Sequence, residues 1–372
     1  MEDLGFRRAA PALAVFAGVR LLGLAVLAGW GAAVGSSPHT LLSARWDSLW
    51  YAGIAARGYG YEVVLPNGDV HSNLAFFPLL PWLERLVAAP TGLSYGSAGL
   101  VVSAVAGLAA AWGIFAVAGL VHGRRAGVWA VALWAALPVA VVQSMAYSES
   151  LFTALAAWAL YAALRGRWLT AGLLAAGAGL TRPVGVAVVA AVWVAAALAR
   201  RRGERSWRAA AGALLAPLGA AAYVLWVGAR TGGGLLGYLD VQGGWGNGFD
   251  GGRAFALFIG AKLGSGSPGG VAAGIGLIAG VALVLWLYGL CVRQRQPAAL
   301  LVYGGIVLAL ALCASAYFGS KPRLLLPAFT LLLPPAVGLA RWRTGRASAL
   351  LGAVALASAG YGAFWLNGSG PP

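Results

Sequence analysis

Long apolar runs separated by short polar segments fill the chain from end to end. A helix needs roughly 20 apolar residues to cross the hydrocarbon core of a bilayer. Runs that reach or approach this length predict about eleven helices, near residues 9–34, 97–121, 127–143, 150–164, 168–180, 184–199, 209–229, 270–292, 298–318, 324–340 and 347–366. Several runs are short, so we expect tilted, broken or merged spans in the middle of the chain. The pattern predicts an all-α polytopic membrane protein, with residues 1–372 forming one transmembrane domain.

Composition agrees with this prediction. Of the 372 residues, 60% are hydrophobic and only 10% are charged, against about 25% charged in a soluble domain. The formal net charge of +16 would suggest nucleic acid as a partner of a soluble protein. Here the basic residues form short clusters between apolar runs, which membrane topology explains, and no nucleic-acid partner is expected.

The basic clusters also predict the orientation. They all fall on one side if the N-terminus is cytoplasmic: Arg7/Arg8, Arg124/Arg125, Arg165/Arg167, Arg200 to Arg208, Arg293/Arg295 and Arg341 to Arg346. The opposite side then receives the loops 35–96 and 230–269, together with most of the acidic residues. We therefore expect a multi-pass protein of the cell membrane with its active site on the extracytoplasmic side.

The outer loop 35–96 carries two predicted interfacial helices. One runs from Asp47 to Arg57 and places Trp46, Leu49/Trp50 and Ile54 on one face, as in helices that lie at a membrane surface. The other, near residues 74–85, is apolar but short and contains two prolines and a charge pair, which fits an interfacial or re-entrant helix. The Gly-rich loop 230–269 suits either a mobile lid or a floppy connection.

Asp47 is the main candidate for chemistry, because it is a carboxylate packed among aromatics just after the first apolar run. It could be the N-cap of the short helix, since Asp is a preferred cap. It could instead be a general base at the membrane surface. The two roles are compatible, because a cap position also aims the carboxylate.

Four cations are candidates for binding an anionic group. Lys321 and Arg323 lie at an outer boundary against the positive-inside tendency, which suggests a lipid phosphate, although a headgroup anchor is the simpler alternative. Arg182 lies in an outer turn and could be an interfacial anchor. Arg20 lies near the middle of the first span and must find a partner inside the bundle, either a structural one or a ligand.

Glu149 and His71 complete the polar candidates. Glu149 opens the fourth span, where a helix dipole alone would favour an acid. His71 follows Asp69 by two residues, but two ligands without further partners are weak support for a metal. We predict no metal site and no cofactor, with a divalent metal not excluded.

Several of these residues together resemble a known family. The elements Arg45-Trp46-Asp47-Ser48-x-Trp50-Tyr51, Gly58-Tyr59, Ala75-Phe76-Phe77-Pro78-Leu79-x-Pro81 and Tyr147-Ser148-Glu149-Ser150-Leu151-Phe152 look like those of the PIG-V-like mannosyltransferases, which are GT-C membrane glycosyltransferases. The resemblance covers roughly residues 40–185 and continues loosely through Lys321-Pro322-Arg323. The Ala/Gly/Arg-rich composition is typical of a bacterial, actinobacterial member.

The resemblance implies an inverting transfer of mannose from polyprenyl-phosphate mannose to a lipid-linked or cell-envelope acceptor. Asp47 matches the family's catalytic base. Lys321 and Arg323, with Arg182 and Arg20 as further candidates, would hold the donor phosphate. Substrate binding is assigned to nearby side chains of the outer segments: Trp46, Trp50, Tyr51, Tyr147, Glu149 and His71.

Two other functions stay open at this stage. A GT-C transferase could use another polyprenyl-phosphate sugar, because the sequence does not distinguish donors that differ by the orientation of a hydroxyl. A non-catalytic lipid or solute transporter would also have many helices and intramembrane charge. The acids gather in outer loops and no inverted repeat is visible in the sequence, which favours the enzyme.

Overall fold

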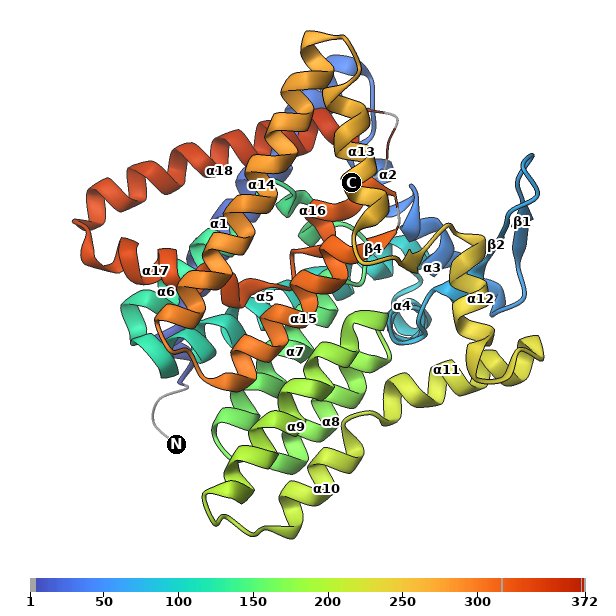
Figure 1. Cartoon of the computed structure of the whole chain (residues 1–372). Coiled ribbons are helices and arrows are strands. Elements are labelled where there is room, and N and C mark those ends of the chain that lie inside the picture. The colour runs from blue at the N-terminus through green and yellow to red at the C-terminus, as the bar shows by residue number, and fades with distance from the viewer. Residues whose placement is uncertain (1–4, 316, 369, 371–372) are drawn as a thin grey trace.

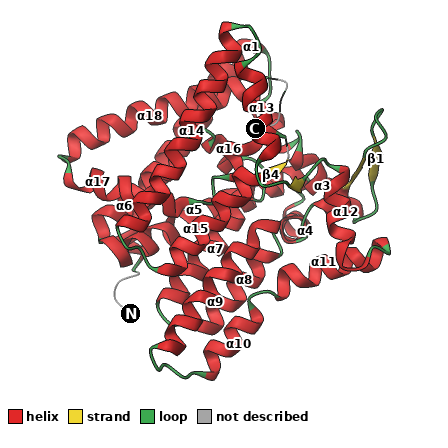
Figure 2. Ribbon diagram, in the orientation of Figure 1, coloured by secondary structure: helices red, strands yellow, loops and turns green. Residues whose placement is uncertain are grey.

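The computed structural model describes residues 5–315, 317–368 and 370, and it confirms the all-α prediction. Helices fill almost the whole chain, and strands are confined to a few short segments (Figures 1 and 2). The bundle positions two segments, residues 35–94 and 232–267, that together cover one end of it and that we call the outer segments after the predicted topology.

Within the described residues, six helical stretches are long and apolar enough to cross a membrane. They are α1 (Phe6–Val34), α5 (Tyr95–His122), η4 with α9 (Pro183–Gly185 and Val186–Arg201), α10 with α11 (Trp207–Leu215 and Leu218–Thr231), α14 (Pro268–Arg293) and α18 (Thr344–Leu366). A further pair of helical segments, Phe318–Leu324 and Phe329–Arg341, passes the same test together but is bent by 68°, as in a broken span or a re-entrant loop. This bent pair contains η6 (Phe318–Ser320), α16 (Lys321–Leu324), η7 (Phe329–Leu332) and α17 (Leu333–Arg341).

Every predicted apolar run has a helical counterpart, but the number of eleven transmembrane helices is not confirmed. The remaining core helices are too short to pass the same test: α6 (Arg124–Ala135), α7 (Glu149–Leu164), α8 (Trp168–Gly179) and α15 (Ala298–Cys313). The run 127–143 leaves the α-helix at Ala135 because Pro138 disfavours helical backbone before it, and it ends in η3 (Ala140–Ser144).

The core lies around α5 and α7, which pack against each other and against α6 and α8. Small residues allow this close approach, as is usual between helices in membranes. One such close contact joins α8 to α10, where a Cβ added to Gly172 would lie 2.4 Å from the carbonyl oxygen of Gly212. Only glycine fits there.

The first outer segment contains α2 (Pro38–Ser43), α3 (Asp47–Arg57), the hairpin β1 (Glu62–Val64) and β2 (Val70–Ser72), η2 (Asn73–Ala75) and α4 (Leu79–Thr91). The strands are antiparallel, with Val63 opposite His71. Both predicted helices are present as α3 and α4, and their location in the membrane interface stays a prediction. Ser48, Tyr51, Ile54 and Ala55 face inward, whereas Leu49 is exposed, because α5 and α4 cover that side of α3.

The second outer segment is more structured than a floppy connection. It contains η5 (Gly234–Leu236), α12 (Gly237–Gly244), β3 (Gly248–Phe249) and α13 (Arg253–Leu263). β3 pairs with β4 (Ala314–Ser315), and α12 packs beside β2, next to the projecting hairpin (Figure 1). The expected lid motion stays a prediction.

Candidate active site

Four charged side chains from four separate segments meet at the end of the bundle where α7 begins. Arg323 on α16 lies between two carboxylates, with Nη1 2.8 Å from Asp47 Oδ2 and Nε 3.3 Å from Glu149 Oε1. Arg182, just before η4, forms a further ion pair with Glu149 Oε1. Two cations and two anions thus make one chain of ion pairs, Asp47–Arg323–Glu149–Arg182, which we call the charge network.

The charge network is mostly buried, yet it retains unused hydrogen-bonding capacity. Glu149 and Arg323 are 1% and 8% exposed, whereas the side chain of Asp47 is 24% exposed and reaches the surface. Arg323 Nε and Nη1 and both carboxylate oxygens of Glu149 have no hydrogen-bond partner of good geometry among the described residues. Buried polar atoms in this state are rare and need an explanation, such as a catalytic role or a bound water or ion.

Hydroxyl groups surround the charge network. The backbone N–H of Asp47 donates to the Tyr147 hydroxyl at 3.3 Å, and the ring of Tyr147 lies under the Arg323 guanidinium, 5.1 Å away. Tyr51 and Ser148 share a hydrogen bond of 2.9 Å, and Arg182 Nη1 donates to Ser148 at 3.3 Å. Burial is the main cause that raises the pKa of Tyr51 and of Tyr147 above the usual value, so both phenols stay neutral.

Asp47 is not the N-cap of its helix. Trp46 occupies the cap position, so Asp47 is the first residue of α3, and its carboxylate is held by Arg323. The positive end of the helix dipole still favours an acid there. Trp46 has a φ of 51°, one of two positive values for non-glycine residues in the described chain. Such backbone is costly and clusters at functional sites, and here it turns the chain just before Asp47.

Arg45 holds this turn in place, a role that the sequence did not reveal. Its Nη1 donates to the carbonyl oxygen of Leu366 at 2.6 Å and its Nη2 to that of Gly368 at 3.1 Å. Its guanidinium also lies 4.1 Å from the centre of the Trp46 ring. The end of α18 therefore anchors the residue that precedes the strained tryptophan. Ser148 is a second residue to which the sequence assigned no role, although it lies in the motif Tyr147-Ser148-Glu149-Ser150.

Two of the predicted phosphate-binding cations lie elsewhere. Lys321 Nζ donates to the carbonyl oxygens of Ala311 and Ala314, both at 2.8 Å, and lies 4.6 Å from the centre of the Phe255 ring. Arg20 donates to the carbonyl oxygens of Ala135 and Ala140, where α6 ends. Each cation satisfies backbone carbonyls that helix ends leave open. Their predicted role toward a phosphate is left without geometric support.

The remaining predicted substrate-binding residues form an aromatic cluster next to Asp47. Trp50 stacks on Phe76 with ring centres 5.6 Å apart and meets Trp245 edge-on at 4.9 Å. His71 stacks on Trp245 at 4.0 Å. A cavity of about 310 Å³ lies beside the cluster, between α3 and the hairpin, and it is lined by Leu49, Trp50, Gly53, Arg57, Tyr61, Val63 and Asn73.

Trp245 and Phe76 were not predicted as site residues. Trp245 comes from the second outer segment and donates from Nε1 to the carbonyl oxygen of Ser72 at 3.0 Å. The imidazole of His71, the residue weighed above as a metal ligand, packs against the indole ring of Trp245. In the described part of the chain, no group of three His, Cys, Asp or Glu side chains gathers as metal ligands would.

The fold and the site together define a class: a polytopic membrane bundle with a buried charge network beneath two outer segments. A family profile described as dolichyl-phosphate-mannose-protein mannosyltransferase matches residues 73–226. The matched part contains Tyr147, Glu149 and Arg182, but neither Asp47 nor Arg323. No curated protein sequence matches the chain.

Solved structures of ArnT from Cupriavidus metallidurans have a similar fold. The structure bound to undecaprenyl phosphate superposes with a TM-score of 0.55 at 15% identity, covering 91% of this chain and 61% of that one. The apo structure gives a TM-score of 0.51 at 18% identity, with coverages of 81% and 56%. The chain thus spans less than two thirds of the length of ArnT. The GT-C-like bundle predicted from the sequence is confirmed as a fold, whereas the PIG-V-like grouping stays a prediction.

Proposed function

We propose that the chain is an inverting membrane glycosyltransferase that moves mannose from polyprenyl-phosphate mannose to a lipid-linked or cell-envelope acceptor on the outer face of the membrane. The charge network carries the proposal, because it places a surface carboxylate, Asp47, directly against a buried cation, Arg323. The mannosyltransferase profile supports the sugar, and the ArnT fold supports a polyprenyl phosphate carrier.

The reaction needs one base and one stabilised leaving group. Asp47 takes the proton from an acceptor hydroxyl while that oxygen forms a bond to the anomeric carbon on one face. The bond from the anomeric carbon to the phosphate oxygen breaks on the other face, and the configuration inverts. The polyprenyl phosphate leaves as an anion, so it needs cations placed in advance and no acid.

Arg323 is the best-placed cation for the leaving phosphate, and Arg182 is the second. Guanidinium groups bind phosphate oxygens through paired hydrogen bonds, and Arg323 Nη1 and Nε already face anionic oxygens, those of Asp47 and Glu149. We infer that the donor phosphate competes with Asp47 for Arg323. Binding of the donor then releases the carboxylate as the base for the acceptor. Glu149 keeps both arginines in place throughout.

The aromatic cluster and its cavity suit the sugar of the acceptor. The flat aromatic rings of Trp50 and Tyr61 line the cavity and can pack against the apolar face of a sugar ring. Asn73 and Arg57 line the same cavity and offer polar groups to the sugar hydroxyls. The cavity opens beside α3, the helix that carries Asp47.

The experiment is an assay of purified protein with polyprenyl-phosphate mannose and a membrane lipid extract, with products identified by mass spectrometry. We expect a mannosylated product with inverted anomeric configuration. Asp47→Asn should reduce transfer by ~100-fold or more, the scale for loss of a general base. Asp69→Asn is the matched control, because Asp69 lies on the exposed hairpin turn and makes no contact with the charge network.

Three results would contradict the proposal. Transfer of a different polyprenyl-phosphate sugar, with mannose inert, would reassign the donor and keep the reaction. No product from any such donor would favour a transporter. Equal activity of Asp47→Asn and the unmodified protein would remove Asp47 from the mechanism.

A further inference from the structure

The C-terminal end of α18 is tied to the turn that precedes Asp47. Arg45 donates to the carbonyl oxygens of Leu366 and Gly368, at 2.6 and 3.1 Å. Leu366 is the last residue of α18, a helix that packs against α1. No residue of this helix end belongs to the charge network or to the aromatic cluster, so the contact adds a further element to the site.

Arg45 caps the end of α18. The last carbonyl groups of an α-helix have no partner within the helix, and the negative end of its dipole attracts a cation. The planar guanidinium donates to two of these oxygens, which fixes its direction. A second anchor holds the helix end independently of Arg45. The hydroxyl of Ser36 donates to Asn367 Oδ1 at 2.6 Å, and Asn367 Nδ2 donates to the carbonyl oxygen of Ala363 at 2.7 Å.

The main chain from Arg45 to Ser48 is a tight turn. Ser48 Oγ donates to the carbonyl oxygen of Arg45 at 2.6 Å and accepts a hydrogen bond from its N–H at 3.0 Å. Trp46, between them, has a φ of 51°, which residues other than glycine rarely adopt. The Arg45 guanidinium covers the Trp46 ring, and this ring packs against the apolar cluster that contains Leu366. These contacts fix the turn, so a shift of Arg45 also shifts Asp47.

Asp47 is supported both at its carboxylate and at its backbone. Arg323 holds the carboxylate, whereas the backbone N–H donates to the Tyr147 hydroxyl at 3.3 Å. Under the proposed function, the donor phosphate displaces the carboxylate from Arg323. The position of the freed carboxylate then depends on its own backbone, and that backbone follows the turn that Arg45 holds. The contact with α18 therefore matters most in the step in which Asp47 accepts a proton.

We propose that Arg45 is a positioning residue for Asp47 and that the end of α18 is the fixed point from which it acts. The inference rests on the proposed function and adds a residue to it. Among the described residues, Arg45 forms no ion pair with the charge network, and it does not line the cavity beside α3. Its effect on the reaction passes through the turn.

Two measurements on Arg45→Gln test the proposal. The transfer assay should show a kcat that is lower by ~10- to 100-fold, the scale for a misplaced catalytic group. The KM for the donor should stay unchanged, because the cations of the charge network are intact. Hydrogen exchange of the same protein in detergent, followed by mass spectrometry, should become faster in residues 45–50 and stay unchanged in α7. Arg45→Lys should recover part of the kcat, since an ammonium group can still donate to a carbonyl oxygen.

Asn367→Ala tests the fixed point from the other side of the contact. It removes the hydrogen bonds that hold the end of α18 and leaves Arg45 in place. We expect a lower kcat again, and a double variant with Arg45→Gln that loses less than the product of the two single effects, as residues in one network do. Losses that multiply fully would mean that the two residues act independently, and they would overturn the role of α18.

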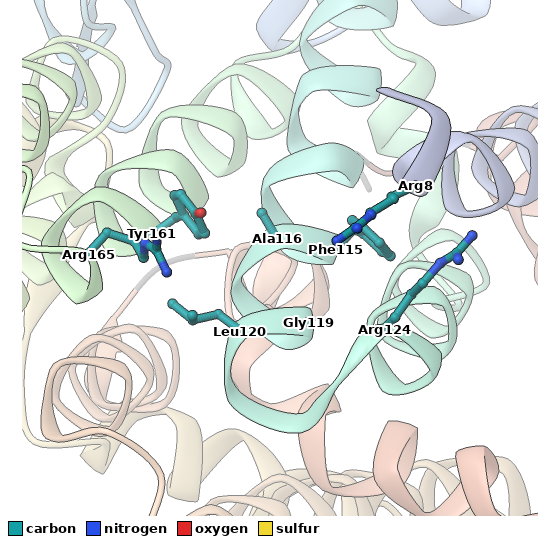
Figure 3. Close-up of a pocket in the computed structure, with 8 residues that line it drawn as sticks. All are labelled: Arg8, Phe115, Ala116, Gly119, Leu120, Arg124, Tyr161 and Arg165. Carbon is teal, nitrogen blue, oxygen red and sulfur yellow. The ribbon is translucent and has the colours of Figure 1, made fainter. Parts of the chain in front are cut away.

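Arg165→Gln is the matched control. Arg165 also lies at the C-terminal end of a helix, α7, but at the other end of that helix from Glu149. There it lines a cavity of about 390 Å³ beside Tyr161 (Figure 3). The substitution removes the same charge from a helix end without touching the turn. We expect unchanged kcat and unchanged hydrogen exchange in residues 45–50.

The two readouts separate the possible outcomes. A lower kcat with faster exchange in residues 45–50, absent from Arg165→Gln, supports the positioning role. Faster exchange with unchanged kcat would mean that Arg45 only caps α18. A lower kcat with unchanged exchange, or a higher KM for the donor, would mean that Arg45 contacts the substrate, and each of these results overturns the proposal. If the unmodified protein transfers no sugar, the proposed function fails, and hydrogen exchange alone decides whether Arg45 holds Asp47.

Discussion

At the scale of single residues, Arg323 is the centre of the outer site. It is 8% exposed and shares its charge with one carboxylate that reaches the surface and one that is buried. A buried charge that loses its partner keeps the cost of leaving water, which is several kcal/mol. Glu149 and Asp47 therefore differ in what they contribute, although both contact the same guanidinium. Glu149 holds two arginines, and Asp47 holds only one.

This difference predicts losses of stability of unequal size for two similar substitutions. Glu149→Gln should lower the free energy of unfolding by ~3–5 kcal/mol, because it leaves Arg182 and Arg323 buried with too little negative charge. Asp47→Asn should lower it far less, since Arg323 keeps Glu149. Thermal unfolding of both variants and of the unmodified protein in the same detergent measures the two losses of stability. Equal losses of stability would show that the two acids have the same structural role.

The residue types of the outer turns were enough to select Asp47, Glu149, Arg182 and Arg323, which the structure brings together. The sequence did not indicate the direction in which each side chain points. Lys321 and Arg323 are two residues apart on α16, yet one faces Phe255 and the other faces Asp47. A four-residue helix has no amphipathic pattern that could distinguish them, and only the packing of the neighbouring elements does.

At the scale of elements, helices with a clear pattern were predicted well and elements that depend on tertiary contacts were not. α3 has the predicted bounds, Asp47–Arg57. The hairpin and α12 were missed, because strands of three residues show no alternation and a helix rich in glycine is not stable alone. Trp245, which ends α12, packs on Trp50 and His71 and holds these elements together.

α4 contains an acid whose charge state is unusual. Glu84 is fully buried against α5, and neither of its carboxylate oxygens has a hydrogen-bond partner among the described residues. Burial raises its pKa to about 9, from an ordinary value of 4.5. The predicted charge pair with Arg85 is absent, since Arg85 donates to the carbonyl oxygen of Ala55 at the end of α3. Glu84 is therefore a neutral acid in the folded protein.

Glu84 predicts a dependence of stability on pH. Between pH 4.5 and about 9 the folded state keeps a proton that the unfolded state loses, so stability falls as the pH rises. Glu84→Gln cannot titrate and should lose less stability across that window. Melting temperatures at about pH 5 and about pH 8 measure the effect. A variant that shows the same slope as the unmodified protein would mean that Glu84 is ionised when folded.

At the scale of the whole molecule, hydrophobic length predicted where the spans lie but not how many cross completely. Pro138 and Pro217 interrupt helices that the apolar runs continue through, and the helical segments of the run 324–340 meet at a sharp bend. The runs correspond to real helical segments, because burial in lipid requires apolar residues whether a helix crosses or not. Breaks within a run depend on packing, which hydropathy does not record.

The orientation can be tested with single cysteines. We expect Asn67→Cys in the hairpin turn to react with a membrane-impermeant maleimide in intact cells. Arg205→Cys, between α9 and α10, should react only after permeabilisation, because the basic clusters place that turn in the cytoplasm. Both changes are made after the free cysteines Cys291 and Cys313 are replaced by alanine. The reverse labelling pattern would invert the protein in the membrane and remove Asp47 from the outer face.

The ion pair between Asp47 and Arg323 has a kinetic consequence. Under the proposed function, the base is occupied while Asp47 stays on Arg323, and water at the surface is not activated. Arrival of the donor phosphate frees the carboxylate, so the acceptor reacts only in a complex that already holds the donor. When no acceptor is present, the freed carboxylate faces water, and the proposed function predicts slow hydrolysis of the bound donor. Release of free mannose measures this hydrolysis, and its loss in Asp47→Asn is expected, whereas equal hydrolysis in that variant would mean that Asp47 is not the group that donor binding releases.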